Sequence, residues 1–295
     1  MGGANVLRKE LNMTTATSDI IKATSEGIER WSEEITVSLH ENGKGYLVSG
    51  DSRIKEDEFF PRVTSVLDIL EKYGLRTWAM RMALAYVEDN LAEATRIHSF
   101  DKALDLTLKG AAVAHEERRD TAADFGTEAH ALLQQLFIDP NTVVPDEFRS
   151  VVHAWMQWLD ESELKVLSTE QQLYYSDTTS SMAPITFAGT ADLIALDKQG
   201  MPVICDWKTG ANIYPEYALQ MAAYSMGLGF CGVGRFLNAE QIANTRAIVV
   251  KLPKEEDGKL EFKEVNNLFY HEEIFAYACK LKQWKSDRNK WMKGN

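Results

Sequence analysis

The sequence contains few cysteines and no long apolar segment. Its three cysteines, Cys205, Cys231 and Cys279, lie far apart and form no C-x-x-C pair. Neither a disulfide framework nor a zinc ribbon is therefore predicted, and a reducing compartment fits. No run of about 18 apolar residues occurs, so no membrane span is predicted. We therefore expect a cytoplasmic protein that does not engage a membrane.

The chain also lacks an excess of positive charge and a nucleotide-binding loop. It has 32 Lys and Arg residues against 44 Asp and Glu residues, for a net charge of −12. Proteins that bind nucleic acid through many phosphate contacts are usually basic, so an acidic one needs a locally positive channel or bridging metal ions. Basic clusters do occur at 76–81, 118–119 and 280–293, although solvated helix faces would explain them equally well. No G-x-x-x-x-G-K-[ST] motif is present, which excludes an ATP-driven helicase–nuclease complete in this chain.

The length of the chain predicts one large domain. With 295 residues, of which 45% are hydrophobic, the chain can bury a sizeable core. We expect a mobile tail over residues 1–20 and a single domain over 21–295. Within this domain, a helical wall is expected over 60–163, a sheet core over 164–270 and a final helix over 271–293. The final helix is predicted to turn its lysines outward. Its apolar residues, expected to face inward, are Ile274, Tyr277, Ala278, Leu281 and Trp284.

The most informative stretch is 187–224, which begins with two short apolar runs rich in β-forming residues. A polar turn at 197–200 joins them, and the pattern predicts an antiparallel hairpin. Side chains alternate across a strand, so Asp206 and Lys208 share one face of the second strand, while Asp192 stands among apolar neighbours on the first. Acids and a lysine within a hydrophobic hairpin are costly unless something pairs with them. A divalent cation is the obvious partner.

The chemistry of such a cation follows from the ligands available. Mg²⁺ and Mn²⁺ prefer carboxylate, carbonyl and water oxygens. Asp192 and Asp206 can clamp one ion, and the backbone carbonyl of Trp207 is a third candidate ligand. Lys208 can orient or deprotonate an attacking water, which would give metal-assisted hydrolysis. Ordinary surface charges on an exposed hairpin are the alternative interpretation of the D-x-K triplet taken alone.

Two predicted helices flank this hairpin in sequence. The helix that follows it places Tyr217, Gln220 and Tyr224 on one face. An earlier helix carries a G-x-x-x-H run at 126–130, with His130 on its apolar side. A lone histidine in such a place is usually a core residue, whereas the spacing ahead of the acidic hairpin favours a site residue.

The order of these motifs resembles a known family. An acid on one strand, D-x-K on the next and Q-x-x-x-Y on the following helix resemble the PD-(D/E)xK nuclease superfamily. Within it, the chain is similar to the RecB-type exonucleases, particularly the stand-alone exonucleases carried by bacteriophages. The resemblance covers residues 60–230. It implies that Asp192 and Asp206 bind metal and that Lys208 is the catalytic lysine.

The resemblance assigns further positions. The histidine of the family's G-x-x-x-H motif is an additional metal ligand, which here would be His130. Glu170 lies on the strand before the G-T-x-D segment. Glu170, Gln220 and Tyr224 would support the site or contact the nucleic acid, and so would Tyr217.

Two further points concern the regions around these motifs. A W-A-x-R match to the phage relatives places Arg81 where it could reach phosphate, a surface arginine being the alternative. Some relatives hold an iron–sulfur cluster on four cysteines, which three cysteines cannot supply.

We therefore expect an α/β fold with a restriction-endonuclease-like core. A mixed central sheet of about four to six strands would be flanked by helices, and an N-terminal helical region would form one wall of a cleft. The expected activity is that of a Mg²⁺- or Mn²⁺-dependent deoxyribonuclease, an exonuclease acting on linear DNA in phage or bacterial recombination, repair or degradation. The alternatives are a catalytically silent nuclease-fold module that binds DNA ends and a structure-specific endonuclease.

The expected partner is a DNA substrate, together with a single-strand-annealing or single-strand-binding protein. A phage-encoded enzyme of this kind would act in the cytoplasm of the bacterial host. The sequence does not determine the oligomeric state or the polarity of digestion.

Overall fold

The computed structural model describes most of the chain as two compact units. The described residues are 35–55, 57–70, 73–94, 100–179, 184–230, 232–255 and 258–293. The larger unit comprises the described residues up to Ile69 and from Ala129 onward, and the smaller unit is Leu70–Glu128. The predicted tail over 1–20 lies outside the described residues.

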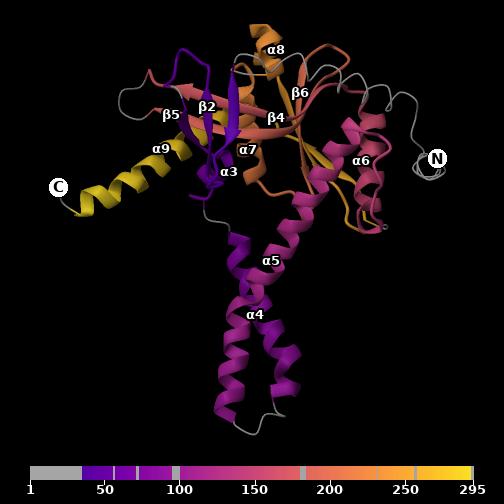
Figure 1. The fold of residues 1–295 in the computed structure, drawn as a ribbon, viewed down its shortest axis with the longest axis vertical. Coiled ribbons are helices and arrows are strands. Elements are labelled where there is room, and N and C mark those ends of the chain that lie inside the picture. Colours follow the sequence, from indigo (N-terminus) through magenta and orange to yellow (C-terminus); the bar gives the residue numbers. More distant parts are fainter. Residues whose placement is uncertain are drawn as a thin grey trace. The chain divides into compact units, whose positions relative to one another are not determined.

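The larger unit is built on a five-stranded sheet with the order β4-β5-β6-β7-β8 (Figure 1). Its strands are β4 (Lys165–Asp177), β5 (Ile185–Leu196), β6 (Pro202–Lys208), β7 (Arg246–Lys251) and β8 (Glu261–Glu264). The β6–β7 pair is parallel and the other pairs are antiparallel. The predicted mixed sheet flanked by helices is confirmed, while the cleft wall stays a prediction.

The β5–β6 hairpin forms the middle of this sheet, as its sequence predicts. Nearly all residues of both strands are buried, which suits a strand covered on two faces. The turn is held by Asp197, whose side chain accepts hydrogen bonds from the backbone N–H groups of Gln199 and Met201, both at 2.9 Å. Gly200 completes it with a φ of 78°, a conformation that favours glycine.

Helices cover both faces of β6. Trp207 meets Trp158 of α6 (Arg149–Ser162), with ring centroids 5.3 Å apart, whereas Asp206 bonds to Gln220 of α7 (Glu216–Leu228). Because consecutive side chains point to opposite faces of a strand, α6 and α7 lie on opposite sides of the sheet. Both tryptophans of α6, Trp155 and Trp158, are buried in the core.

A second, three-stranded sheet lies at the start of the described chain. It consists of β1 (Thr36–Leu39), β2 (Gly45–Ser49) and β3 (Glu58–Pro61), all antiparallel, followed by the short helix α3 (Val63–Leu67). Two 3-10 turns, Asp146–Phe148 and Gly232–Phe236, and the short helix α8 (Ala239–Ala243) complete the larger unit apart from α9. The small sheet contacts the large one, because the Tyr46 hydroxyl of β2 is hydrogen-bonded to the Thr190 hydroxyl of β5 at 2.9 Å.

The smaller unit is a helical hairpin. It comprises α4 (Tyr73–Ala94) and the part of α5 (Phe100–Ile138) up to Glu128. The helices approach closely at Gly110, where an added Cβ would lie 2.2 Å from the Tyr86 hydroxyl. The helix α5, which carries His130, runs from Phe100 to Ile138 without a break.

The last helix, α9 (Leu268–Lys293), departs from its predicted orientation. Tyr277, Leu281 and Trp284 were expected inside but are 63%, 49% and 58% exposed. The buried side is formed by Phe275, Ala278 and Cys279. Of the five residues predicted to face inward, only Ala278 is buried.

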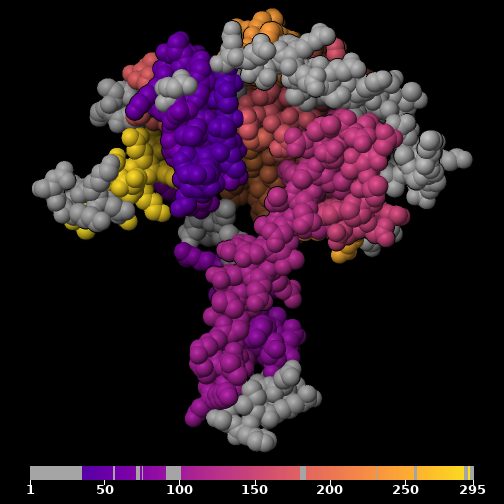
Figure 2. Space-filling view, in the orientation of Figure 1, coloured from indigo at the N-terminus to yellow at the C-terminus, as the bar shows by residue number. Residues whose placement is uncertain are grey.

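The reason for the different orientation is that α9 carries two apolar stripes and only one can face the core. Phe275 packs its ring against Phe187 of β5, with centroids 4.9 Å apart. The helix also contacts α7 and α3. Figure 2 shows it, in yellow, beside the indigo start of the described chain. Among the described residues, no helix has the length and apolar character needed to cross a membrane.

A buried carboxylate connects the loop after β2 to the large sheet. The Tyr174 hydroxyl donates a hydrogen bond to Asp51, and Arg53 forms a 2.7 Å ion pair with the same carboxylate. The hydrogen bond from Arg53 is the main reason why the pKa of Asp51 lies well below its ordinary value of 3.8. The ionised carboxylate therefore stabilises the fold above that ordinary pKa, and this stabilisation is lost as the pH falls through the lowered value.

We expect Tyr174→Phe to lower the free energy of unfolding by about 1.5–3 kcal/mol, because a buried carboxylate loses a hydrogen bond. Urea denaturation at neutral pH measures this. The matched control is Tyr175→Phe, since that ring stacks on Phe187 and its hydroxyl has no recorded hydrogen bond among the described residues. Equal losses in both variants would contradict the role of the carboxylate.

Candidate metal centre

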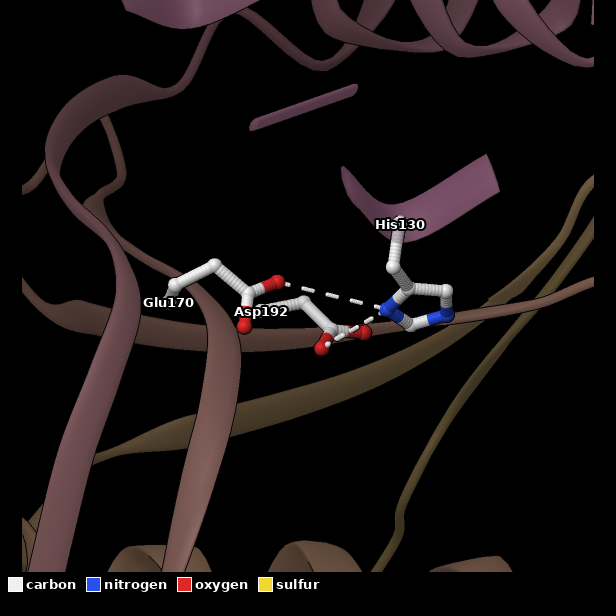
Figure 3. A group of neighbouring side chains, drawn as sticks. All are labelled: His130, Glu170 and Asp192. Carbon is white, nitrogen blue, oxygen red and sulfur yellow. Dashed lines mark ion pairs between the residues drawn. The ribbon is translucent and has the colours of Figure 1, made fainter. Parts of the chain in front are cut away.

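Three side chains from three elements form the cluster that can hold a metal ion. His130 of α5, Glu170 of β4 and Asp192 of β5 place one ligand atom each within 4.8 Å of one another. Both carboxylates point toward the imidazole, whose Nδ1 lies 3.3 Å from Asp192 Oδ1 and 4.0 Å from Glu170 Oε1 (Figure 3).

Strand pairing brings the two carboxylates together. The register pairs Thr169 with Leu193 and Gln171 with Ala191, so Glu170 stands opposite Asp192 on neighbouring strands. Glu170 has a φ of 47°, a left-handed conformation that costs a non-glycine residue on the order of 1 kcal/mol. Such strain persists only where the surrounding structure holds the residue in place, and here it aims an acid at the cluster.

The backbone N–H and carbonyl of Trp207 connect the cluster to the next strand. Its N–H donates a 2.6 Å hydrogen bond to Asp192 Oδ2, and its carbonyl oxygen lies 3.1 Å from His130 Nε2. When Nε2 carries the hydrogen, it donates to this carbonyl and Nδ1 keeps a free lone pair directed at the acids. Backbone carbonyls commonly orient metal-binding histidines in this way. The predicted metal contact of the Trp207 carbonyl stays a prediction.

Asp206 and Lys208 lie on the α7 side of β6. Gln220 Nε2 donates to Asp206 Oδ1 at 2.9 Å and to the Tyr224 hydroxyl at 2.8 Å. The other oxygen, Asp206 Oδ2, is buried and forms no regular hydrogen bond within the described chain, and Lys208 is its ion-pair partner. The ammonium group of Lys208 also lies over the ring of Tyr217, 4.9 Å from its centroid.

The pKa values of the acidic residues show an excess of buried negative charge. Burial raises the pKa of Glu170 to about 7, and the charge of Asp192 adds to this effect. Burial likewise raises the pKa of Asp206 to about 6, although Lys208 opposes the shift. Burial lowers the pKa of His130, but the charge and hydrogen bond of Asp192 outweigh it and raise that pKa to about 9. A cation placed among these groups would relieve their repulsion.

The residues present therefore fit a divalent metal ion. The donor set consists of carboxylate oxygens and one imidazole nitrogen, all partly or fully buried, and one carboxylate oxygen lacks a regular hydrogen bond. Carboxylate-rich sites suit Mg²⁺ and Mn²⁺, and an imidazole ligand is tolerated by several transition metals. The arrangement can hold a cation beside an ammonium group.

The structure brings together all but one of the side chains that the sequence proposed. Those linked by the contacts above are His130, Glu170, Asp192, Asp206, Lys208, Tyr217, Gln220 and Tyr224. Glu170 lies among the atoms that can bind metal, and its expected role in supporting the site or contacting DNA stays a prediction. Arg81 is exposed on α4 in the smaller unit, and its contact with phosphate stays a prediction.

Sequence reasoning missed two contributors to this region. Tyr214 is exposed and packs edge-on against Tyr217, with centroids 5.7 Å apart. Gly189 lies against Tyr224, because a Cβ there would come within 2.8 Å of that ring. The glycine that opens the Gly-Thr-Ala-Asp run was the only signal for this close packing.

These features define an α/β protein with a buried acidic cluster able to hold a divalent cation. Residues 91–286 match the PD-(D/E)XK nuclease superfamily, and the chain belongs to it. The match spans the candidate residues from His130 to Tyr224. Membership implies a metal-dependent hydrolase of phosphodiester bonds with a DNA substrate.

The other comparisons add little. No curated protein matches the chain. A solved structure named "Crystal structure of SSO0001" is 12% identical over 55% of this chain and 70% of that chain, with a TM-score of 0.29. A likeness this weak carries no argument about this protein.

We expect Glu170→Gln to weaken Mn²⁺ binding by on the order of tenfold or more, because one charged ligand is removed from the cluster. Titration followed by the electron paramagnetic resonance of free Mn²⁺, without DNA, measures this. The control is Glu147→Gln, which removes an exposed acid from the 3-10 turn just before α6. Unchanged affinity in Glu170→Gln would show that this carboxylate does not bind the ion.

Proposed function

We propose that the protein is a metal-dependent deoxyribonuclease of the RecB type that resembles the stand-alone exonucleases of bacteriophages. The observation that carries the proposal is the pair of contacts made by the Trp207 backbone, which joins the His130, Glu170 and Asp192 cluster to the strand that bears Asp206 and Lys208. An acidic cluster and a lysine meeting in this way are what hydrolysis of a phosphate ester requires.

In this proposal the metal is held by His130, Glu170, Asp192 and Asp206. The bound cation, Mg²⁺ or Mn²⁺, would supply Lewis-acid stabilisation of the charge that develops on the phosphodiester. Lys208 is kept in place by Asp206 and Tyr217, so its N–H groups can orient the attacking water and interact with phosphate oxygen.

Gln220 and Tyr224 act through Asp206. The amide of Gln220 fixes one carboxylate oxygen of Asp206, while Tyr224 accepts from the same amide and is buried. This arrangement leaves the other carboxylate oxygen turned toward Lys208. Gln220 and Tyr224 are therefore positioning residues in the proposal, and their buried location argues against a direct contact of Tyr224 with DNA.

The exonuclease assignment rests on the resemblance to the RecB type. The presence and convergence of every expected catalytic residue type supports an active enzyme over a silent DNA-end-binding module. An annealing or single-strand-binding protein would be its partner in phage or bacterial recombination, repair or degradation.

We expect linear, end-labelled DNA to be degraded with Mg²⁺ or Mn²⁺ and to stay intact with EDTA. Lys208→Ala should lower the rate by on the order of 10²-fold or more, because the group that orients water is lost. Asp206→Asn should abolish cleavage, and Glu147→Gln should cleave like the unmodified protein. Melting curves confirm that each variant is folded.

The form of the substrate separates the remaining alternatives. An exonuclease leaves circular single-stranded DNA intact, whereas an endonuclease cuts it. Binding of DNA ends without cleavage in either metal would identify a silent module and overturn the proposal. Parallel 5′-labelled and 3′-labelled substrates give the polarity.

A second prediction concerns the ring of Tyr217. Tyr217→Leu should lower kcat by about tenfold with little change in KM, because a partly buried cation–π contact contributes about 1–2 kcal/mol to holding an ammonium group. Tyr217→Phe retains the ring and should keep most of the activity. If Tyr217→Phe lowered kcat as much as Tyr217→Leu, the hydroxyl rather than the ring would be the important group.

A further inference from the structure

The outer face of α9 carries an apolar stripe that the core does not use. Tyr277, Leu281 and Trp284 follow one another at intervals of four and three residues, which places them on one side of the helix. We call these three residues the α9 stripe. Each is about half exposed or more, and exposed apolar patches bordered by polar residues commonly mark binding surfaces.

The helix that bears the stripe is firmly attached by its other side. Phe275, Ala278 and Cys279 are buried in the larger unit, and the Lys282 ammonium group donates a hydrogen bond to the backbone carbonyl of Ser65 in α3. The stripe is therefore displayed by an anchored helix and does not lie on a loose end of it.

Positive charge borders the stripe. Lys280, Lys285 and Arg288 are exposed, and the Lys280 ammonium group lies 5.7 Å from the centre of the Tyr277 ring. The ion pairs recorded for the described part of the chain include neither Lys285 nor Arg288. Residues 277–293 contain six Lys or Arg residues and the single acid Asp287, in a chain whose net charge is −12.

This combination of charges and rings selects the kind of partner. A second copy of the chain would bring the same positive charges to the interface, so self-association through the stripe is opposed by repulsion. A polyanion is attracted instead, and exposed aromatic rings among lysines and arginines are typical of surfaces that bind single-stranded nucleic acid. A duplex hides the faces of its bases, whereas unpaired bases can stack on Tyr277 and Trp284.

We propose that the α9 stripe and its basic border form a binding surface for single-stranded nucleic acid, separate from the residues of the metal centre. Unpaired bases stack on Tyr277 and Trp284, and phosphates pair with Lys280, Lys285 and Arg288. The inference does not require the proposed catalytic roles, because it rests on the surface of α9 alone.

The test uses the full chain and a fluorescein-labelled thymidine oligonucleotide of 20 nucleotides in EDTA, followed by fluorescence anisotropy. The double variant Tyr277→Ala, Trp284→Ala should weaken binding by on the order of 10–100-fold, because two stacking contacts are lost. The variant Tyr277→Phe, Trp284→Phe keeps both rings and should bind within about threefold of the unmodified protein.

The basic border makes a separate contribution. The triple variant Lys280→Ala, Lys285→Ala, Arg288→Ala should reduce the slope of log affinity against log salt by about 2, as expected for three lost phosphate contacts on a single strand. The control is Phe262→Ala, Lys263→Ala, which removes an exposed ring and an exposed lysine from β8 and should change nothing.

Several results would overturn the proposal. One is that the unmodified protein shows no binding of the oligonucleotide at all. Another is that the Tyr277→Ala, Trp284→Ala variant binds with unchanged affinity, and a third is that the control variant loses as much affinity as the stripe variants. The proposal would also be overturned if a stripe variant still bound the oligonucleotide but lost binding to anionic phospholipid vesicles. The same holds if that variant changed its oligomeric state in sedimentation while still binding the oligonucleotide.

The same variants distinguish this inference from the catalytic proposal. If cleavage fails but the stripe variants lose binding in EDTA, the surface stands and the nuclease assignment falls. If the stripe variants bind normally while Asp206→Asn abolishes cleavage, the nuclease assignment stands and the α9 surface proposal falls.

Discussion

The site depends on the backbone of one residue, Trp207. Its N–H bonds to Asp192 of β5 and its carbonyl oxygen faces His130 of α5. These two groups belong to the two peptide planes that meet at the Cα of Trp207, so one residue positions both a carboxylate and an imidazole. The indole of the same residue packs against Trp158, so the core of the protein holds this residue in place.

Alternation along β6 explains how a buried strand can also carry polar chemistry. Trp207 points toward α6, while Asp206 points to Gln220 of α7 and pairs with Lys208. Burial makes each of these charges costly, so each is met by an opposite charge or a hydrogen bond. The raised pKa values of Glu170 and Asp206 show that the protein's own groups do not fully offset this cost, which is what makes the cluster suited to a cation.

Sequence reasoning succeeded where the relevant interactions are local. Two short apolar runs rich in β-forming residues around Asp192 and Asp206, with the turn at 197–200, were enough to predict the hairpin that the structure contains. It failed for α9, because both faces of that helix carry apolar residues and periodicity cannot say which face meets the core. Contact of Phe275 with Phe187, two residues far apart in the chain, decided the orientation. Local patterns likewise could not place Glu170 opposite Asp192, because strand pairing determines that neighbour.

The sequence by itself determined the kinds of chemical group available, the strands and helices that carry them, and the family to which the chain belongs. These follow from residue type and short-range spacing, which act within a few residues. Only the tertiary structure decided that Glu170 and His130 meet Asp192, that the Trp207 backbone links them to β6, and that a basic aromatic face of α9 stays outside. Each of those outcomes depends on packing between segments distant in the chain, where burial of one surface competes with burial of another.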